Sequence, residues 1–112
     1  MPSGEISMLQ FDEHSNGNTI ELHVGEEFVI TLRENPTTGF RWNPISSGEP
    51  ACTLLDNSFD LIGSTPGNGG SHSWHFQAVK EDSSKIEFAY RRSWEQDRLP
   101  AQTFTVSVYV RA

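Results

Sequence analysis

The sequence has a single cysteine, no long apolar run and few basic residues. Cys52 alone forms neither an internal disulfide nor a structural zinc site, and we predict that it is a small buried hydrophobic residue. No stretch approaches the roughly 20 apolar residues of a membrane span, and no basic segment followed by an apolar leader opens the chain. We therefore expect a soluble domain, either cytoplasmic or exported with a leader absent from this chain.

Basic side chains are outnumbered, with 8 Lys and Arg against 15 Asp and Glu and a formal net charge of -7. This balance excludes nucleic acid and anionic membranes as partners of the whole domain and favours a partner with a basic rim. The 112 residues fit one domain, 1–112, in which 1–7 is predicted to be a loose N-terminal extension. We expect a monomer, because no pattern signals a second interface.

No segment of ten or more residues keeps a helical period. Instead, apolar residues alternate with polar ones, which is typical of strands with one face in a core. The clearest apolar sets are Ile20/Leu22/Val24, Phe28/Ile30/Leu32, Trp74/Phe76/Ala78, Ile86/Phe88/Tyr90 and Phe104/Val106/Val108/Val110. Weaker strand candidates are residues 8–11, 40–43 and 51–62.

About seven to eight short antiparallel strands predict an all-β fold, an immunoglobulin-like β-sandwich, with a small barrel as the alternative. The lone cysteine excludes a true immunoglobulin domain. Turn signals at 16–18, 25–27 and 81–84 are predicted to connect antiparallel neighbours.

Three connections are longer or unusual in composition, at residues 34–39, 63–70 and 92–100. Loops held by a rigid scaffold commonly carry function. The second and third loops should emerge at the same end, because the strands predicted at 71–79 and 85–91 run antiparallel between them. The first loop joins them if residues 40–62 contribute two strands.

The first loop contains Asn35, Pro36 and Gly39 at positions that predict a stiff turn. Proline fixes its own φ, asparagine can cap the turn that follows it, and glycine permits a positive φ. The tip carries only small hydroxyl side chains, so its backbone fits deep in a partner's groove. An ordinary tight hairpin is the alternative.

The second loop has four glycines in eight residues, but it lacks the Gly-Lys-Ser/Thr ending of a phosphate-binding loop. It is either a flexible connector or backbone available for strand-like hydrogen bonds to another protein. The third loop places Trp94 beside Arg91 and Arg92, a composition typical of interface hot spots. The alternative is that Trp94 folds back as a lid on the core.

An enzyme is not expected, and neither is a metal or cofactor. His72 and His75 are three residues apart on a predicted strand, so they lie on opposite faces and are expected to be surface or edge residues. A second hypothesis is a non-catalytic binding module for carbohydrate or adhesion that uses Trp42, Trp74 and Trp94. It is weakened because Trp42 and Trp74 stand in strand patterns that favour core packing.

The three loops together resemble those of the chagasin family of cysteine protease inhibitors. Residues 35–40, NPTTGF, match the family's first motif in full, and residues 67–70, GNGG, match its second. In the third motif Tyr90, Arg92 and Trp94 agree, whereas Ser93 replaces the usual proline. The likeness extends from about Thr19 through the final predicted strand.

The resemblance implies a reversible, tight-binding inhibitor that closes the active-site cleft of papain-like cysteine proteases with three loops at one end of an immunoglobulin-like sandwich. It implies that Thr37 and Thr38 lie nearest the protease's catalytic cysteine. The remaining binding residues that it implies are Asn35, Pro36, Gly39 and Phe40 in the first loop, Gly67, Asn68, Gly69 and Gly70 in the second, and Arg92 and Trp94 in the third.

Overall fold

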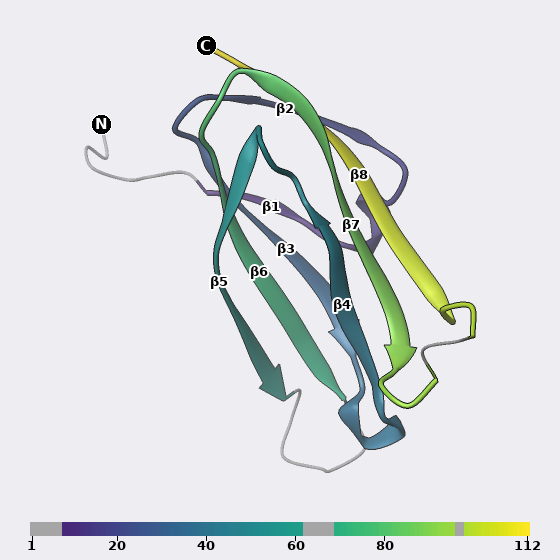
Figure 1. Cartoon of the computed structure of the whole chain (residues 1–112). Helices are drawn as coiled ribbons and strands as arrows, with labels where there is room; N and C mark the ends of the chain where they lie inside the picture. Colours follow the sequence, from purple (N-terminus) through teal and green to yellow (C-terminus); the bar gives the residue numbers. More distant parts are fainter. Residues whose placement is uncertain (1–7, 62–68, 96–97) are drawn as a thin grey trace.

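The computed structural model describes residues 8–61, 69–95 and 98–112, and these form eight strands (Figure 1). The strands are β1 (Leu9–Phe11), β2 (Thr19–His23), β3 (Glu27–Glu34), β4 (Phe40–Ser47), β5 (Cys52–Leu61), β6 (Gly70–Ala78), β7 (Asp82–Arg92) and β8 (Gln102–Arg111). Two short 3-10 helices, η1 (Glu13–Ser15) and η2 (Pro36–Thr38), interrupt the connections. The extension predicted at residues 1–7 lies outside the described residues. None of the described residues forms a helix long and apolar enough to cross a membrane.

The strands form two four-stranded sheets, in the order β1-β3-β6-β5 and β2-β8-β7-β4. This confirms the prediction of an all-β, immunoglobulin-like sandwich with about eight strands. Antiparallel pairing, predicted throughout, holds for the inner pairs and for β4 and β5. The first strand of each sheet differs, because β1 pairs parallel to β3 and β2 pairs parallel to β8.

The three predicted hairpin turns instead join strands of different sheets. Residues 16–18 precede β2, 25–27 lead from β2 into the start of β3, and 81–84 lead into and form the start of β7, which follows β6. The prediction of antiparallel neighbours at these turns is therefore wrong. Glycine and short polar residues form a sharp chain reversal equally well within a sheet and between sheets, so the residue types of a turn do not identify which strands pair.

The inner faces of the sheets carry the predicted apolar sets, and aromatic rings fill the space between them. Trp74 lies 4.4 Å from Phe88 between ring centroids, and Phe28 lies 5.1 Å from Phe76. Trp42 and Trp74 are buried, as their strand positions predict. Cys52 is also fully buried, and burial raises the pKa of its thiol to about 11. The cysteine is therefore a small core residue, as expected.

The strand ends that carry three connections lie at the lower end of the sandwich in Figure 1. At this end β3, β5 and β7 terminate at Glu34, Leu61 and Arg92, and β4, β6 and β8 begin. Residues 40–61 contribute two strands, which is the condition under which the first loop joins the other two. We call this region the loop end.

Candidate functional site

The first loop at this end is ordered by its own hydrogen bonds. The backbone N–H of Thr37 donates to Oδ1 of Asn35 at 3.2 Å, and the hydroxyl of Thr38 donates to the carbonyl of Asn35 at 2.7 Å. Gly39 follows with a φ of 82°, a conformation that favours glycine. The predicted cap and positive φ are confirmed, and Thr37 and Thr38 stand exposed at the tip.

The third loop packs directly on the first. A Cβ at Gly39 would overlap the indole ring of Trp94, so the tryptophan lies against the one residue of the loop that has no side chain. Nε of Arg92 donates to the carbonyl of Thr38 at 3.0 Å, and its guanidinium lies 4.5 Å from the ring centroid of Phe40. The two loops therefore form one surface.

Trp94 is neither a lid on the core nor a free side chain. It is 68% exposed, yet part of its indole covers Gly39. The turn that carries it is closed by the backbone N–H of Glu95, which donates to the carbonyl of Arg92 at 3.1 Å. These contacts hold the third loop although Ser93 stands at the position of the proline in the family motif.

Only the last part of the second loop is described. Gly67 and Asn68, which are predicted binding residues, lie outside the described residues. Gly69 is buried against the first loop with a φ of 75°, and a Cβ there would approach the carbonyl oxygen of Glu34 to 3.2 Å. A Cβ at Gly70 would overlap the carbonyl oxygen of Asp60. These glycines let the second loop rejoin the sheet tightly beside the first.

A buried carboxylate ties the strands at the base of the loops. Glu34 is only 2% exposed, and its Oε2 accepts the backbone N–H of Trp42 at 2.7 Å. Its Oε1 lies 3.0 Å from Nδ1 of His72, whose ring stacks on Trp74 at 4.1 Å between centroids. The side chain of Glu34, at the end of β3, is thus bonded to β4, which follows the first loop, and to β6, which follows the second loop.

Sequence reasoning assigned no role to Glu34 and expected His72 to be a surface or edge residue. A signal was present, because Glu34 continues the inward register of Phe28, Ile30 and Leu32, and His72 precedes Trp74 in the same register. His72 and His75 do lie on opposite faces, but both are partly buried with carboxylate partners. His75 contacts Glu27 at 2.6 Å between Nε2 and Oε1.

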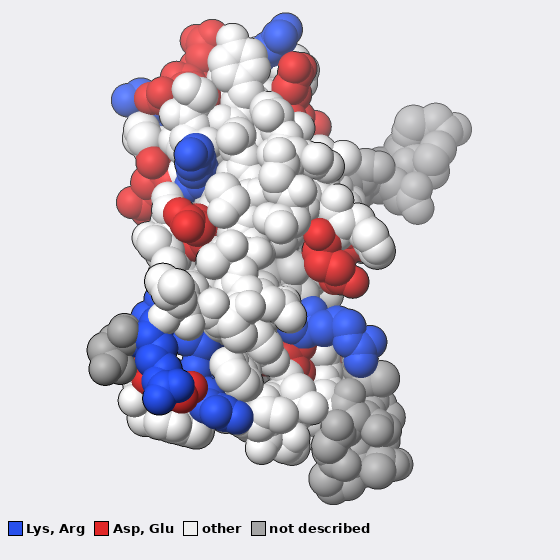
Figure 2. Space-filling model, turned by 90° about the vertical axis from the view of Figure 1, so that its right-hand side faces the viewer, with Lys and Arg blue, Asp and Glu red and all other residues white. Residues whose placement is uncertain are grey.

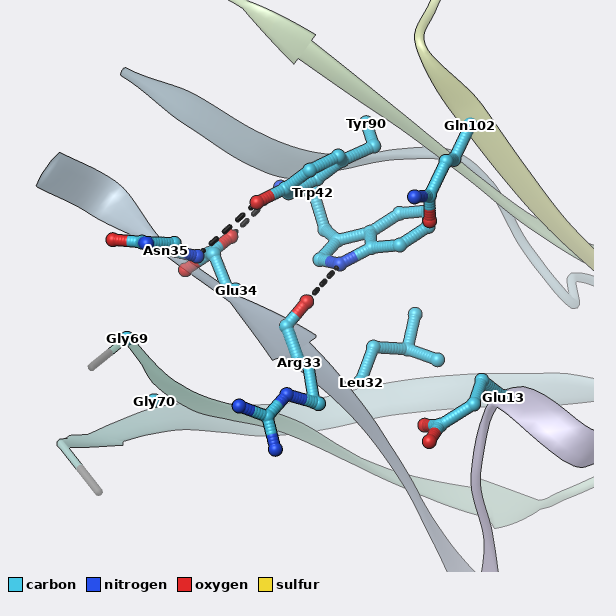
Figure 3. A pocket seen from close by; sticks show the side chains of 10 residues that line it. All are labelled: Glu13, Leu32, Arg33, Glu34, Asn35, Trp42, Gly69, Gly70, Tyr90 and Gln102. Carbon is cyan, nitrogen blue, oxygen red and sulfur yellow. Dashed lines mark hydrogen bonds between the residues drawn. The ribbon is translucent and has the colours of Figure 1, made fainter. Parts of the chain in front are cut away.

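A hollow of about 420 Å³ opens at the base of the first loop, between the two sheets (Figure 3). Tyr90 spans it, and its hydroxyl accepts the backbone N–H of Asn35 at 3.1 Å. On the same wall the indole N–H of Trp42 donates to the carbonyl of Arg33 at 2.8 Å. Side chains of β4 and β7, in one sheet, therefore fasten the entry of the first loop at the end of β3, in the other sheet.

The loop end also carries the most exposed apolar side chains. Among the described residues, the three most exposed large hydrophobic side chains are Leu99 at 94%, Trp94 at 68% and Leu61 at 65%, and all belong to this end. Sequence reasoning had selected only Trp94. Exposed apolar groups gathered beside preformed loops are typical of a protein-binding surface.

The tryptophans do not support the carbohydrate-binding alternative. Trp42 and Trp74 are buried in the core at 8% and 1% exposure, so they offer no ring to a sugar, and Trp94 alone is exposed. Nor do three His, Cys, Asp or Glu side chains gather as metal ligands anywhere in the described ranges. The molecule is thus a β-sandwich whose loop end has the exposed apolar side chains typical of a protein-binding surface.

Comparison with known proteins identifies the family. Residues 21–108 match the model of the chagasin family of peptidase inhibitors, I42. The chain is 30% identical over 96 residues to chagasin of Trypanosoma cruzi, covering 81% of this chain and 87% of that protein. It therefore belongs to the chagasin family, and it is a protease inhibitor domain and not an enzyme.

Solved structures agree on the fold. A cysteine protease inhibitor of Entamoeba histolytica, EhICP2, has a TM-score of 0.84 at 22% identity, covering 93% of this chain and 96% of that one. PbICP-C, solved in complex with falcipain-2, has a TM-score of 0.64 at 20% identity, covering 96% and 95%.

Proposed function

We propose that this protein is a reversible, tight-binding inhibitor of papain-like cysteine proteases and that it closes the active-site cleft with the loop end. The first loop, residues 35–40, enters the cleft with Thr37 and Thr38 foremost. Residues 67–70 of the second loop lie along one side, and Arg92 and Trp94 contact the other. The relative solved with falcipain-2 supports a cysteine protease as the target.

The observation that carries this proposal is the packing of Trp94 and Arg92 on the first loop. A loop that is ordered before binding loses little conformational entropy when it enters a cleft. The flanking loops fix its register, so that no peptide bond is aligned for attack by the catalytic cysteine. A bound inhibitor of this kind is retained without being cleaved.

The exposed apolar side chains at the loop end fit the same proposal. Leu61, Trp94 and Leu99 give up solvent contact on docking, and a standard interface of roughly 1,600 Å² is large enough for a Kd on the order of nM. The proposed complex contains one inhibitor per protease, because one loop end fills one cleft.

A stoichiometric titration tests the proposal. Papain and a cathepsin L-type protease are mixed with increasing inhibitor, and residual activity is followed with a fluorogenic peptide. We expect activity to fall to zero at about one equivalent and to return on dilution, while the inhibitor remains intact by mass spectrometry. No inhibition of either protease at micromolar concentration contradicts the proposal.

Thr37→Arg separates the first loop from the rest of the surface. Thr37 is exposed at the tip and its hydroxyl donates to Oδ1 of Asn35, so the longer side chain removes one hydrogen bond within the loop and is too bulky for a tightly filled cleft. We expect a large loss of inhibition, and the matched control is Thr19→Arg at an exposed position remote from the first loop. Equal inhibition by both variants places the first loop outside the cleft.

A further inference from the structure

Charge is divided unevenly between the loop end and the rest of the chain. Residues 33–42, 59–72 and 90–102, which form the three loops and the strand ends that carry them, hold five of the eight basic residues and four of the fifteen acidic ones, a balance of +1. The remainder holds three basic and eleven acidic residues, a balance of -8. In Figure 2 the blue side chains gather toward the lower end, whereas red ones dominate the upper part.

The arginines flank the first loop on both sides of the sandwich. Arg33 is exposed and alternates with buried Leu32 and Glu34, so it lies on the outer face of its sheet. Arg41 is exposed on the outer face of the other sheet, where its cross-strand partner is Arg91. Like charges directly opposite on two strands destabilise a sheet, so this pairing has a cost for the fold.

Of the three described carboxylates at this end, Glu34 and Glu95 are engaged by other groups, and Asp60 is exposed. The carboxylate of Glu34 is buried and is bonded to the backbone of Trp42 and the ring of His72. Glu95 has its carboxylate oxygens 3.6 Å from Arg92 and 3.8 Å from Arg98. Among the described residues, the exposed positive charge beside the first loop therefore comes from Arg33 and Arg41, and the exposed Asp60 opposes part of it.

We propose that the loop end selects papain-like proteases whose active-site cleft is bordered by acidic residues. This rests on the proposed inhibitory function and adds the charge of the target. The net charge of the whole chain favoured a basic rim, and the distribution of charge reverses that expectation. An acidic rim attracts the loop end and repels the anionic remainder, so the inhibitor approaches with its loops forward and associates faster.

Association kinetics against two forms of one protease test the proposal. The first form has an acidic cleft rim, and in the second the rim carboxylates are replaced by lysine. With the acidic form we expect the association rate constant to fall about 10-fold or more as salt is raised from low concentration to about 1 M, because the Debye length shrinks to about 3 Å. With the lysine form we expect slower association at low salt and the opposite salt dependence.

Two double variants with the same change of charge locate the effect. Arg33→Glu/Arg41→Glu reverses the charge beside the first loop, and Lys80→Glu/Lys85→Glu makes the same reversal at exposed positions outside the loop-end segments. We expect the arginine variant to lower the low-salt association rate constant for the acidic form about 10-fold or more, and the lysine variant to lower it less than about 3-fold. Dissociation rate constants should change little in both.

Equal effects of the two double variants, or faster association of the unaltered inhibitor with the acidic protease as salt rises, overturn the proposed selectivity. Stoichiometric inhibition at about 1 M salt, where steering is screened, measures the inhibitory function separately. If the protein inhibits at about 1 M salt but gives either of those kinetic results, the inhibitory function is retained and only the selection by charge is refuted. Absence of inhibition at every salt concentration refutes the function itself.

Discussion

Replacing Glu34 by alanine tests whether the buried carboxylate holds the base of the loops. The side chain has two partners, the backbone N–H of Trp42 at 2.7 Å and Nδ1 of His72 at 3.0 Å. Hydrogen bonds to a charged group contribute about 1.5–3 kcal/mol each, and removing one member of a buried pair costs about 3–5 kcal/mol. We expect the free energy of unfolding to fall by about 3–5 kcal/mol, a large part of the roughly 5–15 kcal/mol of a typical domain.

The assay is urea denaturation at pH 7, followed by tryptophan fluorescence. Glu34→Gln keeps an acceptor for the N–H of Trp42 and replaces the alanine variant in the assay if that variant does not fold. We expect it to lower the free energy of unfolding by about 1–2 kcal/mol. His72→Ala and the double variant complete a cycle, in which we expect coupling between the two residues of about 1 kcal/mol or more. Glu81→Ala, at an exposed turn, is the control and should change stability by less than about 0.5 kcal/mol.

A folded Glu34→Ala variant that loses less than about 1 kcal/mol refutes the reasoning, since the deletion would then leave no uncompensated partner. If the stability losses of the Glu34 and His72 variants simply add in the double variant, the contact between the two side chains does not contribute to stability as argued.

Three further predictions concern single residues. Trp94→Ala should weaken inhibition by at least about 2 kcal/mol, roughly 30-fold in Ki, with little change in the urea midpoint, and an unchanged Ki removes the anchor role. Gly39→Ala forces a Cβ into the indole of Trp94 at a positive φ, so both stability and inhibition should decrease, and wild-type values for both contradict the described packing. Cys52, whose pKa is raised to about 11, should react with Ellman's reagent at pH 8 only after unfolding. Because the unfolded thiol ionises first, stability should decline between about pH 9 and 11, and a flat profile contradicts its burial.

Period-2 alternation predicted the β-sandwich because it depends only on which residues are apolar. The five clear apolar sets all lie on observed strands, apart from Val24, which stands just beyond β2 and is exposed. Which strands pair was harder to predict from the sequence, since a polar turn has the same composition whether it joins two strands of one sheet or strands of different sheets. The parallel pairs at β1 and β2 follow from such crossings.

The first loop was predicted well because its order is local. Asn35 caps the turn two and three residues further on, and Gly39 follows at once. The contacts of Glu34 with His72 and of Trp94 with Gly39 were not predicted, because they join residues 38 and 55 positions apart in the chain. Polar residues in an inward register, as Glu34 and His72 are, indicate that a partner exists without identifying it.

The three connections at the loop end are attached to the scaffold in different ways. The first passes from one sheet to the other, between β3 and β4, whereas the second stays within one sheet and the third within the other. Lengthening or exchanging either flanking connection therefore leaves the path of the chain between the layers unchanged. Such a scaffold separates two engineering tasks, since the first loop and its contacts with Gly69, Arg92 and Trp94 can be kept while the other residues of the flanking connections are diversified for a different target.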